Sequence, residues 1–443
     1  MSHFVQILVQ IAQFLLSLSI LVFLHEMGHF LLAKLFHTRV EKFYIFFNPW
    51  FSLFKKKLGD TEYGIGWLPL GGYVKISGMI DESMDKEAMK QPPKSYEFRS
   101  KPAYQRLLIM IGGVLVNFVL ALVIYSFILY TWGEQYLPAK NAKYGIMCDS
   151  VALDMGLKNG DMILSVDNKE VDRFHSIFHD IIVDNVSSIQ VRRDGIIVDI
   201  PVSDEHIAPL LKSTEFIHPR FPFIIEDYQK ESPAREAGLQ IEDQVIGING
   251  KEIQFFDEFR DELAGLKSQE ISVNVLREGE KLEYNLTTTS DAAIGVLVRP
   301  SSRFFELKRV EYTFLEAVPA GISKGFSRAS SYLKQLKLIV TPKTKAYEQL
   351  GGFIKIGSIF SKTWNWQLFW EMTALLSIIL AIMNLLPIPA LDGGHVMFLL
   401  YEIVSGRKPG DKFMEYAQIA GMGLLLLLLL YANGNDVVQI FRK

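Results

Sequence analysis

Apolar residues gather in four long stretches of the chain, at roughly 4–35, 107–132, 368–403 and 417–431. Each stretch is long enough, or nearly so, to cross about 30 Å of hydrocarbon as a helix. Elsewhere polar and apolar positions are mixed, and charged residues make up 21% of the 443 residues, close to the fraction found in soluble proteins. The pattern predicts a multi-pass α-helical membrane protein in which four transmembrane segments are joined to a sizeable soluble part.

Positive charge is unevenly distributed between the connections. Thirteen Lys and Arg residues lie from Lys34 to Arg106, and three more lie in the short link between the last two stretches. Because cytoplasmic connections are enriched in Lys and Arg, we expect both of these connections in the cytoplasm and the region from about 133 to 365 on the outer side. The first stretch is too long for the core of a signal peptide, so it is interpreted as an uncleaved span.

Composition excludes some kinds of function and of site. The net charge of −3, with no basic run interleaved with aromatic residues, argues against binding to nucleic acid. Cys148 is the only cysteine, so the chain has neither an internal disulfide nor a thiolate zinc cluster. A metal site must therefore use His, Asp or Glu.

The outer region contains an internal sequence repeat, with one copy at Ser150–Asp161 and the other at Ser232–Asp243. Each copy continues into an alternating apolar run that is typical of a half-buried strand. The repeated pattern resembles PDZ domains, which implies two PDZ-like α+β domains that capture extended peptides or contact a substrate ectodomain by strand addition. A spacer that only blocks access to the membrane part explains the same pattern, and the sequence leaves both interpretations open.

The second repeat is followed by a helical pattern within 311–341, in which basic residues alternate with apolar ones. Such a helix suits the membrane surface, although a soluble helix packed on the repeats is an alternative. We therefore expect a first transmembrane segment (1–36), a cytoplasmic loop (37–106), a second transmembrane segment (107–132), two PDZ-like domains (133–210 and 211–300), a membrane-surface helical linker (301–365), a third transmembrane segment (366–404), a cytoplasmic link (405–416) and a fourth transmembrane segment with a tail (417–443).

The motif His25-Glu26-Met27-Gly28-His29 stands near the inner end of the first span. On a helix, positions four apart share a face, so His25 and His29 can point at one metal ion while Glu26 lies beside it. Two imidazoles at this spacing suit Zn²⁺, with Glu26 free to take a proton from the attacking water. A charged group costs about 2.5–3.5 kcal/mol at the centre of a membrane helix, which argues that these polar residues are functional.

A catalytic zinc ion normally has three protein ligands and one open position. The best third candidate is Asp392, which follows two prolines and precedes two glycines that interrupt the third span. Broken backbone at membrane depth is tolerated where it lines a cavity. Because Asp392 and His25 lie at similar depths in spans that run the same way, they should meet. His395 is a rival ligand, and we favour Asp392.

These combined motifs resemble the site-2 protease family of intramembrane zinc metalloproteases, and in particular its bacterial members with tandem PDZ modules. The resemblance covers nearly the whole chain. It implies Zn²⁺ held by His25, His29 and Asp392, Glu26 as the catalytic base, and Asn384 in contact with the substrate or the transition state.

The resemblance also implies a membrane-associated β-hairpin at 61–80, whose Gly64 and Gly66 would bind the substrate. Such a hairpin would act by pairing, strand to strand, with an unwound substrate helix. Further implications are a location in the bacterial inner membrane in contact with lipid, with the active site near the cytoplasmic face. The implied substrates are single-pass membrane proteins such as an anti-sigma factor or a remnant signal peptide.

Two other functions remain open from the sequence. A non-catalytic membrane scaffold could use the repeats to gather partners around a structural metal, but such a site has no need of Glu26. A metal transporter is the second alternative, and the sequence offers no second ligand cluster along a path.

Overall fold

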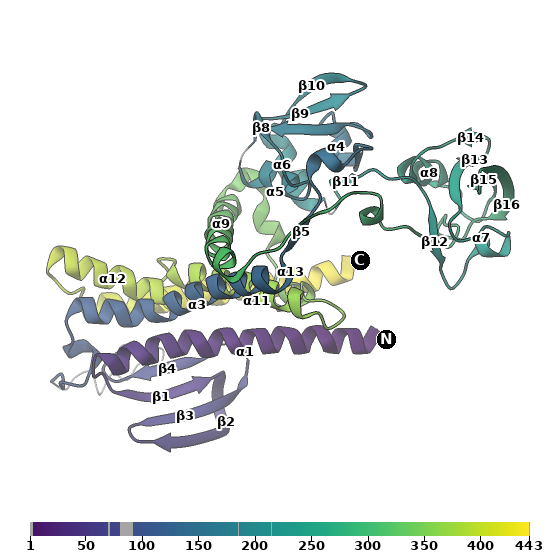
Figure 1. Ribbon diagram of the computed structural model, residues 1–443. Coiled ribbons are helices and arrows are strands. Elements are labelled where there is room, and N and C mark those ends of the chain that lie inside the picture. Colours follow the sequence, from purple (N-terminus) through teal and green to yellow (C-terminus); the bar gives the residue numbers. More distant parts are fainter. Residues whose placement is uncertain (1–2, 70, 80–91, 185, 214, 443) are drawn as a thin grey trace. The chain divides into compact units, whose positions relative to one another are not determined.

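The computed structural model describes residues 3–69, 71–79, 92–184, 186–213 and 215–442 (Figure 1). The chain folds into two compact units. The first, here called the helical unit, comprises Met1–Gly133, Glu311–Lys337 and Tyr347–Lys443. The second, the repeat unit, comprises Glu134–Val310 and Leu338–Ala346.

Long apolar helices dominate the helical unit. Four helices among the described residues are long and apolar enough to cross a membrane, at Phe4–Leu35, Ala103–Trp132, Trp366–Leu385 and Lys412–Phe441, which confirms the predicted four-span architecture. The helices are α1 (His3–Leu35), α3 (Ala103–Trp132), α9 (Phe314–Val340, whose last turn belongs to the repeat unit), α10 (Phe353–Ser358), α11 (Trp366–Leu385), α12 (Asp392–Ser405) and α13 (Asp411–Arg442).

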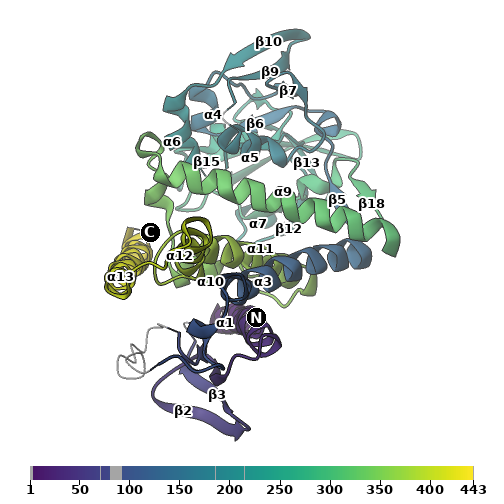
Figure 2. The same cartoon turned by 90° about the vertical axis from the view of Figure 1, so that its left-hand side faces the viewer.

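Helices α1, α3 and α11 pack against one another (Figure 2). A Cβ atom added to Gly28 of α1 would lie 2.3 Å from the carbonyl oxygen of Gly112 on α3, so the two backbones touch where both residues are glycine. Helix α11 is tied to α3 by Ser377, whose Oγ donates to the Asn117 carbonyl oxygen over 2.7 Å. Small residues and buried hydroxyls therefore set the close spacing of these spans.

The predicted third span is broken, as its prolines and glycines indicated. Helix α11 ends at Leu385 and α12 begins at Asp392. Between them Ala390 has a φ of 87°, a conformation that is strained for a residue with a side chain. Added Cβ atoms on Gly393 and Gly394 would collide with the backbone of this loop. The two glycines thus let α12 start directly against the break.

A four-stranded sheet follows α1. Its strands are β1 (Val40–Ile45), β2 (Phe47–Leu58), β3 (Thr61–Leu68) and β4 (Tyr73–Ile76), in the order β2-β3-β1-β4.

The order corrects the predicted hairpin at 61–80, because β3 and β4 do not pair with each other. β1 lies between them, parallel to β3 and antiparallel to β4. Val40, Phe43 and Tyr44 of β1 are buried, and this apolar content favours the central place for that strand. Residues 70 and 80 of the predicted hairpin lie outside the described residues.

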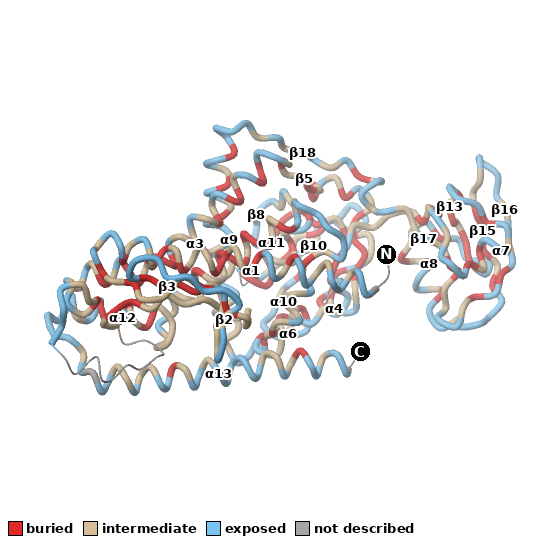
Figure 3. Tube along the Cα trace, turned by 90° about the horizontal axis from the view of Figure 1, so that it is seen from below, coloured by how far each residue is buried: buried red, intermediate tan, exposed pale blue. Residues whose placement is uncertain are grey.

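The repeat unit contains two copies of the same arrangement. The order β10-β9-β7-β8 in the first copy matches β16-β15-β13-β14 in the second, and buried residues alternate along β15 (Figure 3). The elements of the first copy are β6 (Ile146–Cys148), α4 (Ser150–Asp154), β7 (Met162–Val166), β8 (Lys169–Glu170), α5 (Ser176–Val183), β9 (Ser188–Arg193), β10 (Ile196–Pro201), α6 (Asp204–Lys212) and β11 (Ile217–Pro219). Those of the second are β12 (Ile225–Tyr228), α7 (Pro233–Glu236), β13 (Gln244–Ile248), β14 (Lys251–Glu252), α8 (Phe256–Leu263), β15 (Glu270–Arg277), β16 (Glu280–Thr287) and β17 (Val296–Val298).

Each copy contains an equivalent ion pair between an arginine and a buried aspartate. Arg193 donates two hydrogen bonds to the buried Asp161, at 2.8 and 2.7 Å. Arg277 donates two to the buried Asp243, both at 2.7 Å. The duplicated sequence therefore corresponds to a duplicated fold. One further strand pair, β5 (Glu134–Tyr136) with β18 (Lys308–Val310), joins the two ends of this unit.

The predicted linker at 301–365 contains one long helix, α9. Added Cβ atoms on Gly321 and Gly325 would collide with Ser126 and Leu122 of α3. Phe326 also packs edge-on against Phe118 of α3, with ring centroids 5.3 Å apart. Helix α9 therefore lies directly against a membrane-spanning helix.

Candidate metal centre

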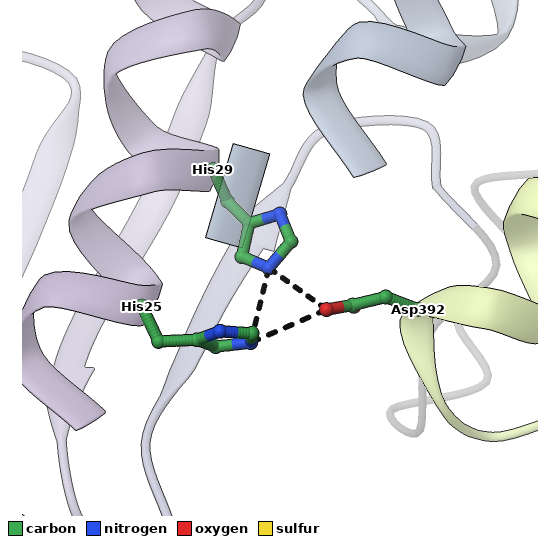
Figure 4. A group of neighbouring side chains, drawn as sticks. All are labelled: His25, His29 and Asp392. Carbon is green, nitrogen blue, oxygen red and sulfur yellow. Dashed lines mark hydrogen bonds and ion pairs between the residues drawn. The ribbon is translucent and has the colours of Figure 1, made fainter. Parts of the chain in front are cut away.

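His25 and His29 lie one turn apart on α1 and present their Nε2 atoms to the same point. The two Nε2 atoms are 3.3 Å apart, as expected for side chains four positions apart on one helix face. Asp392, the first residue of α12, reaches this point from the broken span (Figure 4). Its Oδ2 lies 3.2 Å from Nε2 of His25 and 3.3 Å from Nε2 of His29.

The spacing of these three atoms fits zinc. Zn–N and Zn–O bonds of about 2.0–2.1 Å at the tetrahedral angle place two ligand atoms about 3.3 Å apart. Although Oδ2 of Asp392 is buried and close to both imidazoles, it makes no hydrogen bond of acceptable geometry. A buried oxygen in this position suits a metal ion better than a hydrogen-bond network.

Helix α3 contacts the other side of both imidazoles. Nδ1 of His29 lies 2.8 Å from the carbonyl oxygen of Ile109. Nδ1 of His25 lies 3.4 Å from Nδ2 of Asn117. An added Cβ on Gly113 would lie 2.4 Å from Nε2 of His29, so only glycine allows the α3 backbone to come this close.

Glu26 is 8% exposed and lines a cavity of about 420 Å³ together with both histidines and Asp392. His395, the rival ligand, lines the same cavity. Among the described residues, however, the group of potential ligand atoms within 4.8 Å of one another consists of His25, His29 and Asp392. The other cavity residues are Lys42, Phe47, Gly72, Tyr73, Val74, Lys75, Ile76, Met79, Met110, Ala390, Leu391 and Gln418.

Comparison with known proteins supports a hydrolytic centre. The model of peptidase family M50 matches residues 13–428, which is most of the chain. The chain belongs to peptidase family M50. This is the site-2 protease family, so the protein is a zinc metalloprotease of the membrane.

Relatives of this M50 peptidase match along nearly their whole length. The regulator of sigma-E protease RseP of Escherichia coli is 28% identical over 97% of this chain and 98% of its own. The regulator of sigma E protease of Haemophilus influenzae is 28% identical over 97% and 99%. A Campylobacter jejuni protein named as a zinc metalloprotease is 29% identical over 96% and 92%. The predicted resemblance to the site-2 protease family, of the regulator of sigma-E type, is thereby confirmed.

Asn384 of the M50 peptidase lies beside the three candidate ligands. It stands near the end of α11, with Nδ2 3.3 Å from Nε2 of His25. The structure thus brings His25, Glu26, His29 and Asp392 around one cavity, with Asn384 beside His25.

Gly64 and Gly66 lie outside this cavity. Both belong to β3, which pairs with β1 on one side and β2 on the other, and neither lines the cavity. An added Cβ on Gly64 would collide with the ring of Tyr44, and one on Gly66 with the carbonyl oxygen of Phe47. Close packing within the sheet therefore explains both glycines, whereas β4, at the sheet edge, lines the cavity.

The sequence alone did not reveal the contribution of α3 to this site. Gly112, Gly113 and Asn117 all lie within the second apolar stretch. A polar Asn in an apolar span was a signal, because such residues usually have a function. Spacing along one helix cannot show which neighbouring helix that residue faces.

Proposed function

We propose that this M50 peptidase hydrolyses peptide bonds in or beside the transmembrane segments of single-pass membrane proteins, with Zn²⁺ held by His25, His29 and Asp392. The observation that carries the proposal is the triangle of two Nε2 atoms and one carboxylate oxygen at 3.2–3.3 Å. Such a set leaves one position of a tetrahedral zinc ion open, as hydrolysis needs.

Glu26 is the proposed catalytic base. When bound, zinc makes water acidic enough to lose a proton near neutral pH and polarises the scissile carbonyl. Glu26 takes the proton from the attacking water and gives it to the nitrogen of the leaving amine. Its position in the cavity beside His25 and His29 supports this role. A purely structural zinc site, as in the scaffold alternative, does not use such a base.

Edge strand β4 is the proposed docking site for the unwound substrate. It pairs only with β1 among the described strands, and its residues line the cavity that contains Glu26. A substrate segment added to this edge gives up its intrahelical hydrogen bonds for bonds to β4 and exposes its scissile carbonyl. Asn384, next to His25, is placed to contact that segment. Gly64 and Gly66 support the docking indirectly, by keeping the sheet compact behind β4.

The proposed substrates are anti-sigma factors or remnant signal peptides, in keeping with the relatives named as regulators of sigma-E proteases. The cavity is proposed to lie near the cytoplasmic face of the bacterial inner membrane and the repeats on the outer side. The basic residues in the connection between α1 and α3 support this orientation. In lipid, the exposed apolar residues of the spans contact acyl chains.

The two repeats are proposed to be PDZ-like domains that contact the outer part of the substrate. A groove of about 520 Å³ in the repeat unit is lined by Phe178 of α5, by His175 directly before this helix, and by strand β11. A groove between a strand and a helix suits an extended peptide. Steric filtering, in which the repeats only block access to the membrane part, is a second proposed role.

The test measures zinc content and cleavage of a single-pass model substrate by the purified wild type, Glu26→Gln and Asp392→Ala. We expect about one zinc ion per wild-type chain, zinc retained without cleavage in Glu26→Gln, and zinc lost in Asp392→Ala. A zinc chelator should abolish wild-type cleavage, and added Zn²⁺ should restore it. Unchanged turnover by Glu26→Gln would refute the mechanism, and a wild type without zinc would refute the site.

A further inference from the structure

Asn117 is a fully buried amide in the middle of a membrane-spanning helix. It is 0% exposed, and its Nδ2 faces Nδ1 of His25 at 3.4 Å. Its Oδ1 is buried without a hydrogen-bond partner. A buried acceptor left unpaired destabilises a fold, so this orientation of the amide calls for an explanation.

Metal binding determines which ring nitrogen of His25 carries the proton. Nε2 of His25 faces Asp392 and His29, so a metal ion in the triangle binds at Nε2. The neutral imidazole then carries its proton on Nδ1, which becomes a donor. With Nδ2 of Asn117 facing it, two donors would oppose each other.

Turning the Asn117 amide by 180° removes this conflict. The oxygen and nitrogen of an amide are nearly indistinguishable in shape, and hydrogen bonding decides which way round they lie. After the turn, Oδ1 accepts the Nδ1–H of His25 and is no longer unpaired. The amide nitrogen then takes the place that has no partner, whereas the other orientation sets two donors against each other and leaves a buried acceptor unpaired.

His29 shows the same arrangement with a different acceptor. Its Nδ1 lies 2.8 Å from the carbonyl oxygen of Ile109, also on α3. Ile109 and Asn117 are eight positions apart, a little over two turns of the helix, with an offset of about 80° around its axis. With the Asn117 amide turned, each candidate metal-binding imidazole has its own acceptor on α3.

We propose that Asn117 is a positioning residue that accepts the Nδ1–H of His25 through Oδ1 and so fixes this imidazole with Nε2 toward the metal. The proposal rests on the zinc site proposed above. Metal-binding histidines commonly donate their second N–H to such an acceptor, and loss of the acceptor typically weakens metal binding 10- to 100-fold.

The test compares zinc affinity of the full-length, detergent-purified wild type with that of Asn117→Leu and Asn117→Asp, by competition with a chelator of known affinity. Leucine has a similar size but accepts no hydrogen bond, so we expect zinc to bind about 10- to 100-fold more weakly. Aspartate can only accept, so Asn117→Asp should bind zinc within about threefold of the wild type, or more tightly.

The matched control is Ser377→Ala. It removes the hydrogen bond from α11 to the carbonyl oxygen of the same Asn117 and leaves the side-chain amide in place, so zinc affinity should not change. If Asn117→Asp loses zinc as strongly as Asn117→Leu, the amide acts as a donor and the proposal is wrong. If neither variant loses zinc while the wild type binds it, Asn117 has no positioning role. If the wild type itself binds no zinc, it is the proposed function that fails.

Discussion

At the scale of single residues, the candidate metal centre depends on how closely α3 approaches the two histidines. Gly113 is the residue that permits this approach, because an added Cβ would lie 2.4 Å from Nε2 of His29 and 2.6 Å from Cε1 of His25. Both contacts involve imidazoles that are carried by α1 and contacted at Nδ1 by residues of α3. Neither ring can move away without leaving the triangle.

Gly113→Ala is therefore expected to weaken zinc binding at least about 10-fold, the lower end of the range for disturbed ligand positioning. Alanine has the higher helix propensity, by about 1 kcal/mol, so a loss cannot come from a weaker helix. Gly423→Ala in α13 is the control, since an added Cβ there meets nothing within 4 Å. The measurement is the amount of zinc bound per chain in each of the two variants after dialysis against a chelator. Equal zinc in the two variants would contradict the steric argument.

Cys148 provides a residue-scale prediction for the repeat unit. Burial, assisted by the carboxylates of Asp161 and Asp149, raises the pKa of its thiol from 9.0 to about 12. The thiolate is the reactive form, and at pH 8 a pKa of about 12 leaves roughly a thousandfold less of it than the ordinary value does. Native protein should therefore resist iodoacetamide at pH 8, and denatured protein should be alkylated, as mass spectrometry can show. Rapid labelling of the native protein would contradict this prediction.

At the scale of elements, the break between α11 and α12 is what delivers Asp392 to α1. Helix α12 must then be held in place over its length, and a buried ion pair does this. Arg106 of α3 donates to Glu402 of α12 over 2.5 Å, with side chains 9% and 13% exposed. Arg106 also donates to the carbonyl oxygen of Lys101.

Glu402→Ala is expected to lower the free energy of unfolding by about 3 kcal/mol, because it leaves the Arg106 guanidinium buried without its partner. Zinc affinity should fall as well, since α12 carries Asp392. The double variant Arg106→Met with Glu402→Leu should recover most of the stability, because two apolar residues replace the pair. The thermal unfolding midpoint in detergent measures the effect. A single variant as stable as the wild type would show that the pair contributes little.

At the scale of the whole molecule, the chain forms two compact units with separate cores. The metal centre lies wholly within the helical unit. Each repeat of the other unit has its own arginine–aspartate ion pair. A substitution that destabilises one repeat should therefore leave the helical unit and its candidate metal centre unaffected.

Asp243→Ala tests this independence. It removes two hydrogen bonds from Arg277 and one from the Gln240 backbone N–H, so the second repeat should lose about 3 kcal/mol of stability. Zinc per chain should stay at the wild-type value. Calorimetry and zinc analysis of the same sample measure both, with Asp291→Ala, at an exposed position, as the control. Loss of zinc in Asp243→Ala alone would show that the units are coupled.

Much of this architecture could be predicted because it is encoded locally. Runs of apolar residues determined the spans, and two prolines with two glycines determined where the third one breaks. The spacing of His25 and His29 places them on one helix face whatever surrounds them. The internal sequence repeat likewise predicted two copies of one fold, because each copy specifies its own short helix and strand.

Pairing between distant segments was decided only by the tertiary structure. Strand β1 separates β3 from β4, so the edge strand beside the cavity is β4 and the glycines of β3 are interior. The orientation of α3, set by glycine contacts with α1, brings Asn117 and the Ile109 carbonyl onto the two imidazoles. The sequence by itself thus determined the candidate metal-binding residues and the segments that carry them, because these follow from local patterns. Which groups surround them depends on contacts between segments far apart in the chain, and only the packed structure fixes those contacts.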